Sequence, residues 1–208
     1  MDTARLFVGC LLDLAATRRV VDAGRALRKA LDGAGWRCAW VPPANLHVTL
    51  RFLGDVDAGI TPALSAALTR VARAHAPLKL APRGLLALPS PEAPRVLALD
   101  FAEGADALSA LARAVDDACF ELGFPRDPRP FRPHLTLCRV KQPGGALDAL
   151  AMPRLDAGLA LANELTLARS DLTRLGAEHH AVSRHSLGDA RGPRPEGPRA
   201  PRGQSTST

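Results

Sequence analysis

Runs of apolar residues with two different periods divide this chain into strands and helices. Residues 5–12 are almost continuously apolar, which predicts a strand covered on both faces. Asp13 then suits the N-cap of a helix, and Gly33 suits its end. Between them an apolar stripe recurs at three- and four-residue steps: Val20, Ala23, Leu27 and Leu31. The first 33 residues therefore predict a strand followed by an amphipathic helix.

The same two patterns continue to residue 187. Thr61 and Pro62 predict an N-cap and a first helical residue for a second helix that ends before Pro77. A third helix is predicted to end at Gly123. Strands are predicted over residues 36–41, 46–53, 78–88, 96–101, 134–140, 161–170 and 179–187. Each half of the chain thus contains strands, a helix and one copy of the motif described next, which indicates pseudo-twofold symmetry.

A tetrapeptide of the form His-x-Thr-apolar occurs twice, at residues 47–50 and 134–137. Side chains alternate along a strand, so His47 and Thr49 share one face, and His134 and Thr136 repeat this arrangement. A single copy is an ordinary structural feature of a strand. Two copies, each close to an arginine, predict two half-sites that meet around one small anion.

Two imidazoles and two hydroxyls around an anion suit hydrolysis of a phosphodiester. One neutral imidazole can take a proton from water, and one protonated imidazole can donate to the leaving sugar oxygen. The hydroxyls of Thr49 and Thr136 would hold the non-bridging phosphate oxygens. The site prediction is therefore His47 and His134 as catalytic residues, with the two threonines as phosphate ligands.

Three arginines near the motifs are candidate substrate ligands. Arg51 follows the first motif and is equally suited to a solvated strand position. Arg132 lies in the Pro- and Arg-rich loop before the second motif, where it can bind phosphate or brace the loop. Arg139 follows the second motif, but strict alternation turns it away from the motif face unless a bulge intervenes.

Composition narrows the class of partner. Hydrophobic residues make up 47% of the 208 residues, enough for a core, and the net charge of +6 suits an anionic partner such as RNA or a nucleotide. No apolar run is long enough to span a bilayer, so no membrane partner is expected. The four cysteines lack zinc-type spacing and lie in apolar surroundings, which predicts no metal and a reduced, cytoplasmic protein.

The two motif segments carry a family resemblance. Residues 45–54 and 129–139 resemble the signature segments of the RNA 2′,3′-cyclic phosphodiesterases, also called 2′-5′ RNA ligases, of the two-histidine (2H) phosphoesterase superfamily. Residues 5–8 and 94–99 are similar to two further strands of that family. The resemblance implies an α+β, bilobal fold, in which two antiparallel sheets with outer helices surround a central cleft.

The resemblance also implies an activity. It implies hydrolysis of RNA 2′,3′-cyclic phosphate ends, or of small cyclic nucleotides, to 2′-phosphomonoesters without metal or cofactor, with His47 as general acid and His134 as general base. Where the family has an aromatic residue after a Gly-Ala pair, this chain has His180 as the candidate substitute. Reversible 2′-5′ RNA ligation and a non-catalytic RNA- or nucleotide-binding module are the alternatives.

The sequence patterns also predict where the folded domain ends. Residues 1–187 are expected to form one bilobal domain that acts as a monomer. Residues 188–208 are rich in Gly, Pro, Arg and Ser without periodicity, which predicts a disordered tail.

Overall fold

The computed structural model describes residues 2–145, 147, 160–173 and 176–188. Its helices are α1 (Leu14–Gly33), α2 (Thr61–Arg73) and α3 (Ala105–Glu121), with short 3-10 turns η1 (Pro43–Asn45) and η2 (Ala58–Ile60). Its strands are β1 (Thr3–Leu11), β2 (Arg37–Trp40), β3 (His47–Asp57), β4 (Leu78–Leu88), β5 (Val96–Glu103), β6 (Leu135–Gln142), β7 (Ala160–Ala162), β8 (Glu164–Thr173) and β9 (Gly176–Ser186).

The described strands form two sheets. One is four-stranded in the order β3-β1-β8-β9, and the other is five-stranded in the order β2-β6-β5-β4-β7. All the strand pairings within them are antiparallel. The first motif strand, β3, lies at one edge of the four-stranded sheet, and the second, β6, lies inside the five-stranded sheet. The two motif strands contact each other, so the two sheets meet along β3 and β6.

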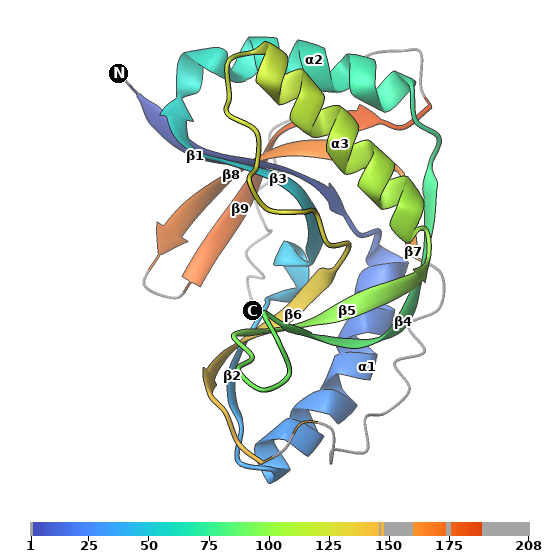
Figure 1. Ribbon diagram of the computed structural model, residues 1–208, viewed down its shortest axis with the longest axis vertical. Helices are drawn as coiled ribbons and strands as arrows, with labels where there is room; N and C mark the ends of the chain where they lie inside the picture. Colours follow the sequence, from blue (N-terminus) through green and yellow to red (C-terminus); the bar gives the residue numbers. More distant parts are fainter. Residues whose placement is uncertain (1, 146, 148–159, 174–175, 189–208) are drawn as a thin grey trace, which may run out of the picture.

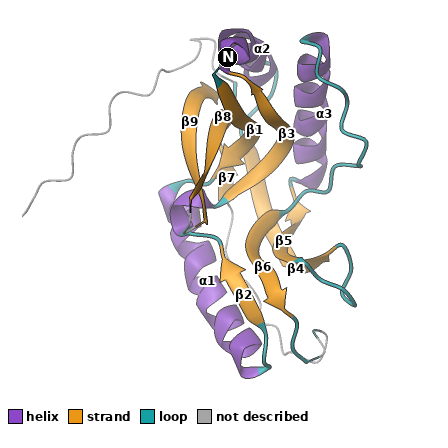
Figure 2. Ribbon diagram, turned by 90° about the vertical axis from the view of Figure 1, so that its left-hand side faces the viewer, coloured by secondary structure: helices purple, strands orange, loops and turns teal. Residues whose placement is uncertain are grey.

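The helices cover the outer sides of this arrangement. Figure 1 shows α2 and α3 side by side over the four-stranded sheet, with α1 running along the five-stranded sheet, and Figure 2 shows the same division from a second direction. Helix α1 begins where Asp13 accepts a hydrogen bond from the Ala16 N–H at 2.7 Å, as the sequence predicts. Burial of its apolar stripe, including Leu27 and Leu31, fixes it against the core.

The predicted fold class is confirmed: the chain is α+β, with two antiparallel sheets and helices outside them. The boundaries differ in detail. Thr61 is the first residue of α2 rather than its cap, and its hydroxyl donates to the Ala58 carbonyl of the preceding turn. Strand β9 begins three residues earlier than expected, because its pairing with β8 continues to Gly176. Of the predicted tail, residues 189–208 lie outside the described residues.

Candidate active site

The imidazole of His47 is held by the backbone that leads into β3. Its Nδ1 lies 2.6 Å from the carbonyl oxygen of Asn45. A carbonyl only accepts, so Nδ1 carries the hydrogen and Nε2 is left available for a substrate. The Asn45 side chain donates to the Ala177 carbonyl at 2.6 Å, which ties this anchor to strand β9 across the sheet.

His134 is held in the same way from the other sheet. Its Nδ1 lies 2.6 Å from the carbonyl oxygen of Arg132, again two residues upstream. Nδ1 therefore carries the hydrogen here too, and Nε2 is again the available nitrogen. The predicted equivalence of the two motifs thus extends to the tautomer of each ring.

A bulge follows each motif at the same position. Between β1 and β3, Thr49 pairs with Gly9 and Arg51 pairs with Val8, so Leu50 has no partner of its own. A bulge adds one residue to one strand and reverses the alternation that follows it. Arg51 therefore lies on the face opposite His47, and the next residue returns to the histidine face.

The second bulge has the same effect in β6. Thr136 pairs with Ala98 and Cys138 pairs with Leu97, so Leu137 is the extra residue. Cys138 is consequently buried at 0% exposure, and Arg139 returns to the face of the histidine. The condition under which Arg139 reaches the site, a local bulge, is thus met.

Arg51 does not reach the predicted phosphate position. Its side chain is buried at 8% exposure and pairs with Asp116 of α3 and with Asp127. The expectation that it contacts substrate is corrected by the bulge at Leu50. The next residue on the face of His47 after Thr49 is instead Phe52, which is 54% exposed.

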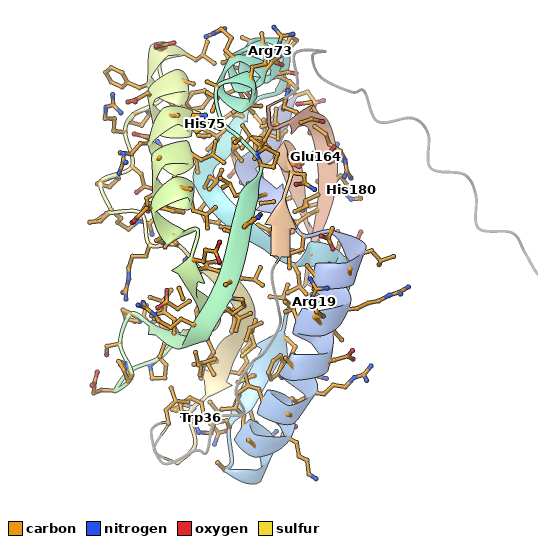
Figure 3. The ribbon with its side chains drawn as sticks, turned by 90° about the vertical axis from the view of Figure 1, so that its right-hand side faces the viewer. Arg19, Trp36, Arg73, His75, Glu164 and His180 are labelled. Atoms are coloured by element: carbon orange, nitrogen blue, oxygen red, sulfur yellow. The ribbon has the colours of Figure 1, made fainter. Side chains whose placement is uncertain are left out.

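The β9 histidine beside the site is His179, not His180. The ring centroid of His179 lies 5.1 Å from that of His47 with the planes at 89°, and 4.9 Å from that of Phe7. His180 is exposed, with Nε2 3.4 Å from a carboxylate oxygen of Asp171, and Figure 3 labels it on the edge strand β9. Because neighbours on a strand point to opposite faces, only one of the pair can join His47.

Two residues of β1, Phe7 and Gly9, pack against His47. The ring of Phe7 is 2% exposed and its centroid lies 4.8 Å from that of His47. A Cβ at Gly9 would lie 2.7 Å from the backbone oxygen of Val48 and 3.5 Å from the His47 ring. Glycine therefore allows β1 to approach the motif strand closely, a role that the sequence patterns did not reveal.

The pKa of His47 reflects its burial, its hydrogen bond and the charges that act on it. Burial lowers the pKa of His47 to about 4, a hydrogen bond from its ring to the Asn45 carbonyl opposes this, and positive charge on His179, His134 and Arg139 lowers the pKa further. His134 and Arg139 belong to the segment and strand of the other sheet, so charges from the second motif act on His47 across the junction of the two sheets. The His47 ring is therefore neutral at pH 7 in the free protein.

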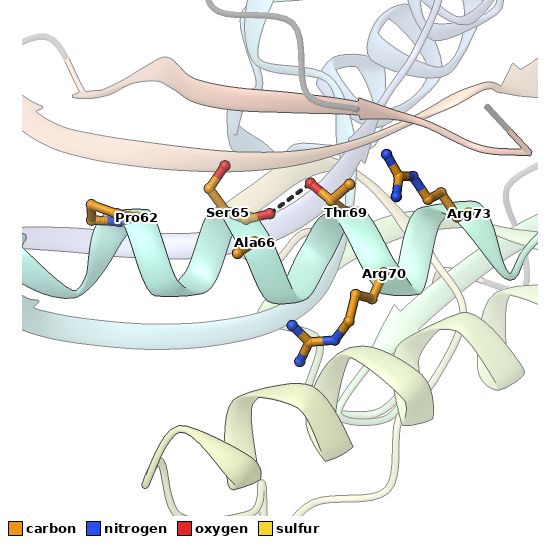
Figure 4. Close-up of a pocket in the computed structure, with 6 residues that line it drawn as sticks. All are labelled: Pro62, Ser65, Ala66, Thr69, Arg70 and Arg73. Carbon is orange, nitrogen blue, oxygen red and sulfur yellow. Dashed lines mark hydrogen bonds between the residues drawn. The ribbon is translucent and has the colours of Figure 1, made fainter. Parts of the chain in front are cut away.

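Three further findings concern the described residues as a whole. No three His, Cys, Asp or Glu side chains in the described part of the chain are grouped as a metal ion would require. A groove of about 570 Å³ runs along α2, on the helix side of the four-stranded sheet, and Figure 4 shows the residues that line it: Pro62, Ser65, Ala66, Thr69, Arg70 and Arg73. No helix in the described ranges is long and apolar enough to cross a bilayer.

Two motif strands with paired histidines and threonines, in two antiparallel sheets, define a two-histidine phosphoesterase. A family model described as LigT-like phosphoesterase matches residues 14–98 and 99–176, and the chain belongs to this family. The sequence-based identification of the family is thereby confirmed.

Relatives and solved structures agree with this family. The chain is 34% identical over 206 residues to an RNA 2′,3′-cyclic phosphodiesterase from Thermus thermophilus, covering 93% of this chain and 99% of the relative. It is 29% identical over 196 residues to an RNA 2′,3′-cyclic phosphodiesterase from Aquifex aeolicus, covering 90% and 100%. A crystal structure of a Thermus thermophilus protein matches with a TM-score of 0.74 at 30% identity, covering 89% and 99%. E. coli LigT complexed with 3′-AMP matches with a TM-score of 0.73 at 25% identity, covering 90% and 100%.

Proposed function

We propose that this protein hydrolyses the 2′,3′-cyclic phosphate end of RNA to a 2′-phosphomonoester by acid–base chemistry of His47 and His134. The observation that carries the proposal is the matched pair of imidazoles, each with Nδ1 bonded to a backbone carbonyl at 2.6 Å and Nε2 left available. The positive charge of His134 lowers the pKa of His47, so the two motifs are close enough for their charges to interact, which supports a shared site. The names of the relatives favour an RNA cyclic phosphate as the substrate.

The reaction needs one base and one acid. The base, His134, takes a proton from water as the water oxygen forms a bond to phosphorus. The bond between phosphorus and O3′ breaks, and the acid, His47, gives its proton to O3′. The products are a 2′-phosphomonoester and a free 3′-hydroxyl. The hydroxyls of Thr49 and Thr136 donate to the non-bridging oxygens, where negative charge grows.

The acid role requires a proton on His47, which is neutral at pH 7 in the free protein. A bound phosphodiester places a negative charge beside the ring, and an opposite charge raises the pKa of an imidazole. Substrate binding therefore supplies the condition under which His47 can act as the acid. A titration of His47 by NMR should show its pKa rising from about 4 when 3′-AMP is added.

A substrate with a sulfur leaving atom tests the two roles separately. A thiolate leaves without protonation more readily than an alkoxide does, so a 3′-bridging phosphorothiolate depends less on the acid. We expect this substrate to restore much of the activity of His47→Ala and little of that of His134→Ala. The reverse pattern would exchange the two assignments.

Phe52 and Arg139 supply a place for the nucleoside. Both lie on the histidine face as a consequence of the bulges, one from each sheet, and Phe52 is 54% exposed. An exposed aromatic ring stacks on a base without requiring a particular sequence. Arg132 lies at the entrance to the second motif strand, where its side chain is exposed to a longer RNA.

The decisive experiment is hydrolysis of an RNA with a 2′,3′-cyclic phosphate end in the presence of EDTA. The wild type should release the 2′-phosphate, and His47→Ala and His134→Ala should each lose at least the roughly 10²-fold that one acid or base contributes. His180→Ala is the matched control, because this histidine is exposed and pairs with Asp171. Full activity in either motif variant would overturn the proposal. Binding of 3′-AMP by a wild type that releases no product would favour a binding module instead.

We also propose that the protein acts as a monomer in the cytoplasm. All four cysteines are free thiols, and Cys10, Cys119 and Cys138 are buried, as suits a reducing compartment. Light scattering after size-exclusion chromatography should give a mass near the 22.0 kDa of one chain. A mass twice that value would refute the monomer.

A further inference from the structure

Arg51 links the first motif strand to the segment that leads into the second. Its Nε forms an ion pair with Asp116 Oδ1 at 2.9 Å, although the N–H is not aligned for a hydrogen bond. One terminal nitrogen lies 3.3 Å from Asp127 Oδ2, and the other donates to the carbonyl of Pro125. Two of these three partners belong to residues 122–134, which we call the α3–β6 loop.

The α3–β6 loop sets the orientation of His134. The carbonyl of Arg132, near the end of this loop, accepts the Nδ1 hydrogen of His134 at 2.6 Å. Any movement of that carbonyl therefore turns or frees the catalytic ring. Arg51 holds the same loop at its beginning, through Pro125 and Asp127.

Few free torsions separate the held part of the loop from the carbonyl that orients the ring. Proline fixes φ near −65°, and the loop has four of them: Pro125, Pro128, Pro130 and Pro133. Asp127 also accepts from the Arg129 N–H at 3.1 Å, which closes the first part of the loop on itself. A displacement at Asp127 is therefore passed to Arg132 rather than absorbed between them.

We infer that Arg51 is a positioning residue for His134: the arginine after the first motif holds the loop that orients the histidine of the second. It lies on the helix side of β3 and acts through the loop rather than on the phosphate. The guanidinium suits this role because its rigid fork reaches three acceptors at once, which a lysine ammonium cannot reproduce in that geometry. The inference rests on the proposed role of His134 in catalysis.

His47 provides an internal control in the same molecule. Its ring has the same tautomer and the same backbone anchor, but that anchor is Asn45, which is held by the Ala177 carbonyl. None of the contacts of Arg51 described above involves this anchor. A change at Arg51 should therefore disturb one imidazole and spare the other.

The variants Arg51→Gln, Arg51→Lys and Asp127→Asn test the inference, with Arg126→Gln as the matched control. Arg126 lies in the same loop and is half-exposed, and its ion pairs with Asp116 and Asp117 go to α3 rather than directly to β3. On cyclic-phosphate RNA, Arg51→Gln and Asp127→Asn should lower kcat by on the order of 10- to 100-fold, because a shift of about 1 Å has costs of that size. KM should stay within about twofold, since the phosphate ligands are unchanged, and Arg126→Gln should keep kcat.

The imidazole NMR signals provide the readout that a purely structural role would not move. In Arg51→Gln and Asp127→Asn, the Nδ1–H signal of His134 should broaden or shift, while that of His47 should stay in place. Loss of kcat without a selective change at His134 would overturn the inference, as would an unchanged kcat with an unchanged His134 signal. If Arg51→Gln does not fold, the other two variants decide. Arg51→Lys keeps a cation at position 51, and Asp127→Asn keeps the ion pair between Arg51 and Asp116. The NMR result stands even if the wild type hydrolyses no RNA, so failure of this inference is separable from failure of the proposed function.

Discussion

A buried histidine far from the active site makes the stability of this protein sensitive to acid. His185 on β9 is 1% exposed. The hydroxyl of Thr69 donates to the Ser65 carbonyl at 2.9 Å, so its oxygen is left to accept from His185 Nδ1 at 3.0 Å. The hydroxyl of Ser183 then donates to Nε2 at 2.9 Å. This arrangement suits the neutral ring and leaves no acceptor for a second ring hydrogen unless Ser183 turns its own away.

The size of the effect follows from the pKa of His185. Burial lowers this pKa from 6.5 to about 4 in the folded protein. Above pH 6.5 the ring is neutral in both the folded and unfolded states, so it contributes no pH dependence there. As the pH falls below 6.5 the unfolded chain binds a proton that the folded protein refuses, which destabilises the fold by about 2 kcal/mol at pH 5. The loss levels off at about 3 kcal/mol below pH 4.

The perturbation is His185→Gln, which keeps a donor and an acceptor but cannot titrate. At pH 7 the variant should be less stable than the wild type by about 1–3 kcal/mol, because its hydrogen bonds are less well aligned. At pH 5 that difference should shrink by about 2 kcal/mol, since only the wild type carries the proton penalty. Urea unfolding at both pH values, followed by the fluorescence of Trp36 and Trp40, measures it. An equal difference at pH 5 and pH 7 would refute the reasoning; His47 also titrates in this range, but it does so in both proteins and cancels.

Three further substitutions address the active site. His179→Phe should raise the pKa of His47 measured by NMR, because it removes a neighbouring positive charge while keeping the ring contact; a pKa that stays or falls would show that charge on His179 is unimportant. Gly9→Ala should lower both the melting temperature and the activity, because the new Cβ would lie 2.7 Å from the backbone oxygen of Val48, and wild-type values for both would contradict the close approach of β1. Phe52→Ala should raise KM for an RNA substrate by roughly 5- to 150-fold with kcat little changed, as loss of about 1–3 kcal/mol of stacking requires; an unchanged KM would remove Phe52 from the nucleoside site.

The fold was largely predictable because its elements have clear periods and clear ends. The helix after Asp13 has an N-cap, an apolar stripe and a terminal glycine, and the structure has that helix as α1. The assignment of strands to two sheets was not predictable from periodicity, since apolar alternation does not say which strand is a partner. That information came only with the family resemblance.

The pairing of the two motif histidines was predictable because the same motif occurs twice in the sequence. The alternation of side chains along a strand predicts that His47 shares a face with Thr49, and His134 with Thr136. In the structure β3 begins at His47, and β6 begins at the residue after His134. His179 was missed because only its neighbour was aligned with the aromatic position of the family. Counting alternate positions along β9 could not have corrected this without knowing which face meets His47.

The positions of Arg51 and Arg139 differ from those that regular strand alternation predicts. Strict alternation puts Arg51 on the face of His47 and Arg139 on the face away from His134, and the structure reverses both. One extra residue in each strand, Leu50 or Leu137, causes the reversal, and an apolar residue in a bulge is indistinguishable in sequence from one in regular pairing. Because the bulges occupy equivalent positions, one bulge turns Arg51 inward, where it contacts the loop before β6, and the other turns Arg139 to the exposed face of His134. The two motif strands therefore have the same backbone irregularity, but their arginines lie on opposite faces and make different contacts.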